Sequence, residues 1–162
     1  MMCSTVDRRD GVVTRGGRRA LYAVELVESE SDRSGTEALF VRYQAAAPNR
    51  HGRHPGVFAL VNGLAWSGTL TAQQQRFRRR ENNWFQENLA DPGQLIPSPY
   101  DSTRYPRSEA WFKSSAVQFL SRVQGYLAIL DAHGIEWIRL ASDRPGRIIY
   151  DDSFQVIVDG RP

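Results

Sequence analysis

The chain has 162 residues, a formal net charge of +3, a hydrophobic fraction of 41% and a charged fraction of 24%. These values are typical of one soluble globular domain that can bury a sizeable core. They exclude a membrane-spanning protein, since no apolar run approaches the roughly 20 residues that a bilayer requires. The N-terminus lacks the apolar segment of a secretory signal, and Cys3, the single cysteine, excludes an internal disulfide. Both features fit the cytoplasm.

Arginine dominates the basic residues, because Lys113 is the single lysine among 21 Lys and Arg. This bias is typical of a GC-rich genome. The arginines are distributed along the chain among 18 acidic residues. A net charge this small does not by itself predict binding to nucleic acid.

The N-terminal part predicts an arm followed by two strands. Residues 1–18 are charged and glycine-rich, so we expect a flexible arm there and a single domain over residues 19–162. Arg19–Glu28 alternates between apolar faces, and Glu37–Gln44 is rich in aromatic and β-branched residues. The two segments predict an antiparallel hairpin.

The middle of the chain predicts two helices. The first begins at Pro55, where the missing amide hydrogen would have no partner within the helix, and continues through the short apolar segment that follows. Thr71 and Gln74 have the spacing of a capping box. The second helix is therefore expected over Ala72–Leu89, and it ends at the turn sequence DPG of residues 91–93.

A long extended loop and a long helix are expected next. Gln94–Arg107 contains three prolines, which neither a helix nor a central strand tolerates. Ser108–Gly134 carries apolar residues at steps of three and four, which predict one long helix. Gly125 lowers helix stability by about 1 kcal/mol relative to alanine, so we expect a kink or a break near it.

Three strands are predicted at the C-terminus: Ile135–Leu140, Arg147–Asp151 and Phe154–Val158. Turn residues at hairpin spacing separate them, which favours an antiparallel meander. The complete order is ββ–ααα(α)–βββ. Grouped strands and helices indicate an α+β fold, with a mostly antiparallel sheet of about five strands and helices packed on one face.

Several stretches together resemble a family of small proteins from high-GC actinobacteria. They are LFVRYQAAAPNRHGRHPGVFALVNGLA, ENNWFQENLADP, AWFKSSA, GYLAILDAHGIEW and DRPGRIIYDDSFQVIV, and they cover roughly residues 39–158. The resemblance implies a bacterial, cytoplasmic, single-domain protein. It carries over no activity, cofactor or catalytic residue.

The loop Asn49–Gly56 is the first candidate site, because it directly precedes a predicted helix start, where backbone N–H groups attract anions. Arg50 and Arg53 could contact a phosphate or carboxylate, and His51 and His54 could move protons. The alternative is a polar turn without a ligand. Two histidines are too few for a zinc site, so we expect neither a metal nor a cofactor.

Two further groups of residues are candidates. Tyr100 and Asp101 in the loop Tyr100–Tyr105, together with Lys113, could contact a ligand, although a surface lysine is the simpler interpretation. Four arginines on the second predicted helix could contact phosphates, although a solvated basic face is the simpler interpretation. These are Arg76, Arg78, Arg79 and Arg80.

Three functions remain open. The sequence contains none of the common catalytic or phosphate-binding motifs, which favours a non-enzymatic accessory or interaction protein with a protein partner. The first alternative is an enzyme that binds a small anionic molecule or nucleotide between Asn49–Gly56 and Tyr100–Tyr105. The second alternative is weak nucleic-acid binding through Arg76–Arg80.

Overall fold

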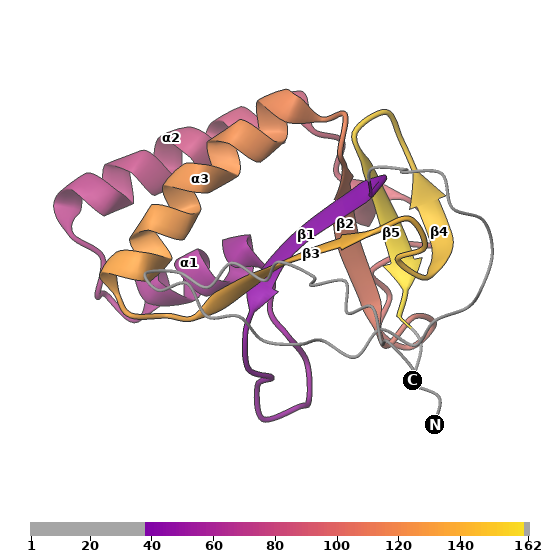
Figure 1. Cartoon of the computed structure of the whole chain (residues 1–162), viewed down its shortest axis with the longest axis horizontal. Helices are drawn as coiled ribbons and strands as arrows, with labels where there is room; N and C mark the ends of the chain where they lie inside the picture. Colours follow the sequence, from indigo (N-terminus) through magenta and orange to yellow (C-terminus); the bar gives the residue numbers. More distant parts are fainter. Residues whose placement is uncertain (1–37, 161–162) are drawn as a thin grey trace, which may run out of the picture.

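A computed structural model describes residues 38–160 and confirms the α+β fold. A five-stranded antiparallel sheet packs against three helices, α1, α2 and α3, which lie together on one side of it (Figure 1). The expected arm over residues 1–18 and the expected strand Arg19–Glu28 lie outside the described residues. Within residues 38–160, no helix has both the length and the apolar character needed to cross a bilayer.

The sheet has the order β3-β1-β2-β5-β4, in which neighbouring strands are hydrogen-bonded. Within residues 38–160, five strands, three α-helices and one short 3-10 helix follow one another. They are β1 (Phe40–Ala45), α1 (Val57–Trp66), α2 (Ala72–Asn88), η1 (Pro92–Gln94), β2 (Ser108–Lys113), α3 (Val117–Ala132), β3 (Trp137–Ser142), β4 (Arg147–Asp151) and β5 (Gln155–Asp159).

The prediction of one helix over Ser108–Gly134 is wrong at its beginning, because Ser108–Lys113 is β2, the central strand. Its side chains alternate with a period of two. Trp111 packs with Val156 and Val158 on one face, while Phe112 joins the core beneath the helices. Side chains that alternate in this way place apolar residues on both faces of β2, one face in each of two apolar clusters.

The expected break near Gly125 is also absent, since α3 is one continuous helix from Val117 to Ala132. Gly125 serves the packing of α3 against α2. A Cβ atom at this position would overlap the ring of Phe77 and lie 2.6 Å from its Cε2. The glycine therefore allows the two helices to approach each other closely.

The expected C-terminal meander is confirmed only for the β4–β5 hairpin. β3 pairs instead with β1 over six residue pairs, from Phe40↔Ser142 to Ala45↔Trp137. Four residues, 143–146, connect β3 and β4 at opposite edges of the sheet. Such a link reaches at most roughly 18 Å, and the strands run in the same direction, so the sheet must curl strongly to bring the two edges together.

Aromatic rings join the helices to the sheet. Phe58 of α1 makes edge contacts with Phe85 of α2 and Tyr126 of α3, each at 4.9 Å between centroids. Phe112 of β2 stacks on Phe119 of α3 at 6.1 Å. Phe58 also makes an edge contact with Phe112 at 6.3 Å between centroids, so these rings hold the start of α1 over the sheet.

Candidate functional site

The candidate site lies where strands β1 and β2 separate. The two strands pair at only two positions, Phe40↔Lys113 and Val41↔Phe112. Each of them pairs more extensively with its other neighbour, β3 or β5. Beyond Val41 the sheet is therefore open between β1 and β2.

Arg42 fills this opening, and its side chain is only 11% exposed. The guanidinium donates hydrogen bonds to Gln44 Oε1 at 2.8 Å, to the carbonyl of Ala110 on β2 at 2.8 Å and to the carbonyl of His54 at 3.2 Å. Burial lowers the pKa of Arg42, and the carboxylate of Glu109, 3.9 Å away, acts in the opposite direction. Arg42 thus places a desolvated positive charge inside the sheet.

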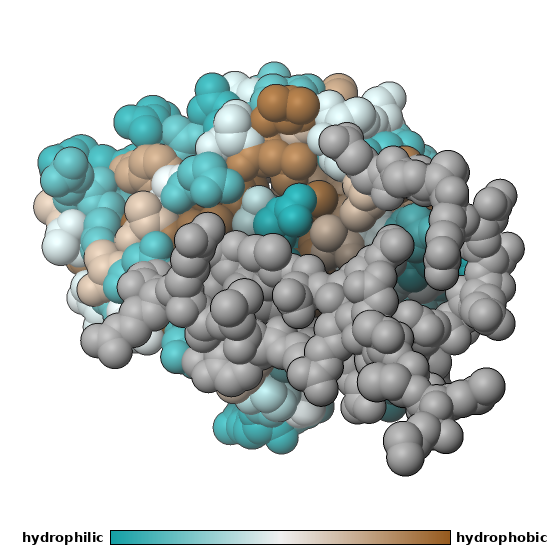
Figure 2. Space-filling view, in the orientation of Figure 1, coloured by the Kyte–Doolittle hydropathy of each residue, from teal (hydrophilic) through white to brown (hydrophobic). Residues whose placement is uncertain are grey.

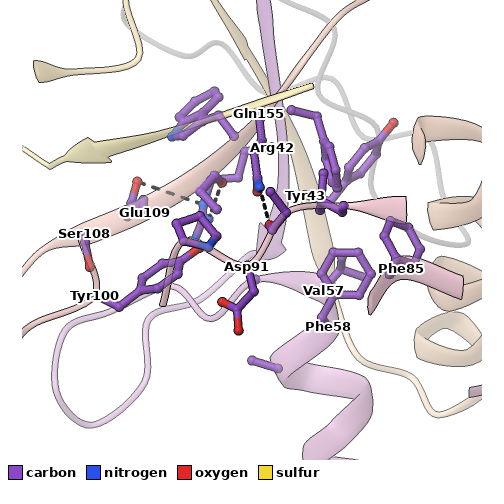
Figure 3. A pocket seen from close by; sticks show the side chains of 18 of the residues that line it. Arg42, Tyr43, Val57, Phe58, Phe85, Asp91, Tyr100, Ser108, Glu109 and Gln155 are labelled. Carbon is purple, nitrogen blue, oxygen red and sulfur yellow. Dashed lines mark hydrogen bonds and ion pairs between the residues drawn. The ribbon is translucent and has the colours of Figure 1, made fainter. Parts of the chain in front are cut away.

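A cavity of about 450 Å³ opens beside Arg42. Figure 3 shows Arg42 and Gln155 on one side of it and Phe58 on the other. The apolar lining residues include Val57, Phe58, Phe85, Leu89 and Phe112, and the polar ones include Arg42, Asp91, Tyr100, Glu109 and Gln155. A mostly apolar cavity with a few convergent polar groups is typical of a small-molecule site. We call it the apolar cavity.

The beginning of α1 forms part of this wall, because Gly56, Val57, Phe58 and Ala59 all line the apolar cavity. Gly56 is the N-cap residue and provides no capping side chain, and the first turn contains no acidic residue. The first backbone N–H groups of a helix have no partner within it and carry a partial positive charge. This end of α1 therefore adds to the positive potential of Arg42.

Tyr100 extends from the proline-rich loop toward Arg42 (Figure 3). Burial, with smaller contributions from the charges of Asp91, Tyr150 and Asp152, raises the pKa of its hydroxyl to about 12, although the charge of Arg42 lowers it. The phenol consequently stays protonated at neutral pH and can donate a hydrogen bond.

A second cavity of about 660 Å³ adjoins the first and shares Arg42, Gly56, Ser108 and Glu109 with it. Among the residues that the structure describes, three arginines line it, Arg42, Arg53 and Arg107, against one carboxylate, that of Glu109. We call it the basic cavity. Gly56 lies at the junction of the two cavities, and a Cβ added there would make ordinary van der Waals contact, 3.8 Å from both Arg42 Nη1 and the Tyr43 carbonyl oxygen.

The predicted loop Asn49–Gly56 forms an ordered polar turn and also borders the basic cavity. Asn49 Oδ1 accepts hydrogen bonds from the backbone N–H groups of His51 and Arg53. The ring of His54 is held 2.9 Å from the carbonyl of Ala45. His51, Arg53 and His54 line the cavity, whereas Arg50 contacts His51 and does not line it.

Of the other three predicted ligand contacts, Tyr100 lines the apolar cavity, whereas Asp101 and Lys113 line neither the apolar nor the basic cavity. Asp101 organises its own turn by accepting from the backbone N–H groups of Thr103 and Arg104. Lys113 lies at the opposite end of β2 and forms an ion pair of 2.6 Å with Asp151. The structure therefore does not bring Asp101 or Lys113 to the histidines.

The four arginines of α2 do not act as one group. Arg78 donates to Gln75 and to Asn62 of α1, and Arg80 donates to Glu81. Arg76 and Arg79 are exposed and form no ion pair with any residue that the structure describes. Of the four, Arg78 is thus used in packing α2 against α1, while Arg80 remains 69% exposed.

Glu81 is a buried carboxylate that forms ion pairs with two arginines, one of which is Arg80. Its side chain is 5% exposed and pairs with Arg122 of α3 at 2.7 Å and with Arg80 at 3.0 Å. Burial alone would raise the pKa of Glu81, but the hydrogen bonds and charges of Arg122 and Arg80 outweigh it and lower the pKa. Arg122 also stacks 3.8 Å from the centre of the Trp84 ring. This cluster joins α2 to α3.

Sequence reasoning missed Arg42, Glu109 and Gln155. Arg42 is the single charged residue in the apolar run LFVRYQ, and Gln155 begins the buried run QVIV. An isolated polar residue in a buried strand was the available signal, because such a group needs a partner or a ligand.

Residues 38–160 contain no group of three or more His, Cys, Asp or Glu side chains that could hold a metal ion. Comparisons with protein-family models, with curated proteins and with solved structures find no match.

Proposed function

We propose that the protein binds an amphipathic organic anion. Its apolar part occupies the apolar cavity, and its acidic group lies at the junction with the basic cavity. The observation that carries this proposal is the buried guanidinium of Arg42, placed at that junction beside the uncapped start of α1. A ligand acid would balance a charge that Glu109 balances only at 3.9 Å.

Each part of the ligand finds a matching surface. Aromatic side chains from α1, α2 and β2 offer apolar contact area to a ring or a short chain. The acid would receive hydrogen bonds from Arg42 and from the Tyr100 hydroxyl, and the partial charge of α1 would favour it further. Arg53 and Arg107 raise the local concentration of anions through the basic cavity.

This proposal keeps the expectation of a non-enzymatic protein and places small-molecule binding ahead of a protein partner. Large exposed apolar side chains are spread over different elements, including Leu39, Trp66, Ile96 and Val117. Figure 2 shows apolar residues over α3 on one face, bordered by hydrophilic ones. If the protein has an accessory role, it would carry out that role through the small molecule that it binds.

A pair of fluorescent probes tests the proposal. 1-Anilinonaphthalene-8-sulfonate is an amphipathic anion, and N-phenyl-1-naphthylamine has the same ring system without the sulfonate. We expect saturable, one-to-one binding of the sulfonate, about tenfold tighter than that of the amine, because a charge-assisted hydrogen bond contributes roughly 1.5–3 kcal/mol. Cooperative urea unfolding of the same sample excludes binding to a molten state. Equal affinities for the two probes would contradict the proposal.

Substitutions that remove single arginine charges test whether the acidic group of the ligand lies near the basic cavity. Arg53→Gln and Arg107→Gln should each weaken sulfonate binding about two- to fivefold at low salt, since exposed charges interact weakly. Arg79→Gln removes the same charge from the exposed side of α2 and serves as the matched control. If Arg79→Gln weakened binding as much as the other two, the effect would reflect net charge and not the basic cavity.

A further inference from the structure

The side chain of Gln155 lies in the wall of the apolar cavity, although the residue as a whole is only 4% exposed. It begins β5 and pairs with Phe112 of β2. Its amide nitrogen donates to the carbonyl of Ala90 at 2.8 Å and to Asp152 Oδ2 at 3.1 Å. Both partners are acceptors, so these bonds fix which end of the amide is nitrogen.

The amide oxygen of Gln155 is left as an unused acceptor. It receives no hydrogen bond from the residues that the structure describes. In this part of the chain, the indole N–H of Trp111 is the one side-chain polar group that is fully buried without a partner. Gln155 Oε1 is therefore not sealed off, and the accessible space beside Gln155 is the apolar cavity.

The neighbouring side chains do not supply the hydrogen-bond donor that Gln155 Oε1 lacks. Asp152 already accepts from Tyr150 and from the backbone N–H groups of Phe154 and Gln155, and as a carboxylate it has no hydrogen to donate. The neighbouring cavity walls from Phe85, Leu89 and Phe112 are apolar. A buried polar atom among apolar walls favours a ligand that supplies the missing donor.

On the basis of the proposed function, we infer that the ligand is an aryl or similarly rigid acid that carries an O–H or N–H donor at the end opposite its acidic group. Arg42 donates to the carbonyl of Ala110, and the Cα of Ala110 lies one strand across and two residues along from the Cα of Gln155, roughly 8 Å away. A benzene ring with a two-carbon acid chain covers this length. Arg42 would hold the acid, and Gln155 Oε1 would accept from the donor.

Three acids test the inference by NMR titration of the 15N-labelled protein. They are 3-(4-hydroxyphenyl)propionate, which has the donor, 3-(4-methoxyphenyl)propionate, which keeps only an acceptor, and 3-phenylpropionate. We expect the hydroxy acid to bind about three- to tenfold tighter than the other two, the usual range for one neutral hydrogen bond. It should shift the side-chain amide resonances of Gln155, while all three acids shift the backbone amide of Gly56.

Gln155→Met supplies the second arm. It removes the acceptor but keeps the length of the side chain and its unbranched stem, so the advantage of the hydroxy acid should disappear while binding of 3-phenylpropionate remains. If this variant does not fold, the ratio between hydroxy and methoxy acids on the unchanged protein decides alone. Equal affinities for the three acids would overturn the role of Gln155 and leave the anion site standing. Failure of all three to shift Gly56, together with failure of the naphthalene sulfonate, would overturn both proposals.

Discussion

Replacing Arg42 with methionine should lower the free energy of unfolding by about 3 kcal/mol or more and abolish binding of the naphthalene sulfonate. Three acceptors, Gln44 Oε1 and the carbonyls of Ala110 and His54, would lose their donor. Each such group costs roughly 1–3 kcal/mol when it stays buried without a partner. Urea unfolding measures the first effect, and a fluorescence titration of the folded fraction measures the second.

Two further variants show whether the loss of stability in Arg42→Met comes from the lost hydrogen bonds of the guanidinium. Arg42→Lys keeps the charge, but one ammonium group cannot donate in the three directions that the guanidinium serves, so most of the stability loss should remain. Arg139→Met removes an exposed arginine from β3 of the same sheet and should change stability by no more than about 0.5 kcal/mol. Similar losses for Arg42→Met and Arg139→Met would show that Arg42 does not hold the opening between β1 and β2 together.

Gly125→Ala should destabilise the protein by up to about 2 kcal/mol even though alanine favours a helix. The added Cβ would overlap the ring of Phe77, which packs against Tyr126 at 5.5 Å between centroids. Overpacking costs typically 1–3 kcal/mol, and the better helix propensity of alanine offsets about 1 kcal/mol of this. The midpoint and slope of urea unfolding give the change in free energy.

Gly63→Ala provides the matched control, because Gly63 also lies inside a helix but has no atom within 4 Å of an added Cβ. This variant should raise the free energy of unfolding by about 0.5–1 kcal/mol. Combining Gly125→Ala with Phe77→Leu should recover part of the loss, since the smaller side chain makes room. If both glycine variants stabilised the protein equally, α2 and α3 would not be in close contact at Gly125.

Local sequence patterns predicted the helices well where the signal lay in neighbouring residues. Both hydrogen bonds of the capping box between Thr71 and Gln74 are present, and α2 begins at the expected residue. β2 was missed because Phe112 and Ala116 face the same core as the apolar stripe of α3. Buried apolar residues therefore recur at steps of three or four from β2 into α3, although the backbone changes from strand to helix.

Long-range pairing explains the remaining errors. Turn residues at 143–146 are consistent with a hairpin, but β3 pairs with β1, and the residues that decide this choice lie about 100 positions apart. The candidate site depends on the same information. Arg42 reaches the junction of the two cavities because β1 and β2 separate after two pairs, and no local pattern reports this separation. The polar loop Asn49–Gly56 was recognisable because turn residues act locally.

A substitution that blocks the apolar cavity shows whether the ligand binds there. Ala59 is exposed on α1 and lines this cavity, so Ala59→Trp should fill the space without disturbing the core. Ala128→Trp adds the same side chain to an exposed position of α3 that lines neither cavity. We predict that Ala59→Trp weakens binding of 1-anilinonaphthalene-8-sulfonate at least about tenfold, equivalent to about 1.4 kcal/mol, while Ala128→Trp leaves it unchanged. Unchanged affinity in a folded Ala59→Trp protein would show that the ligand does not occupy the apolar cavity.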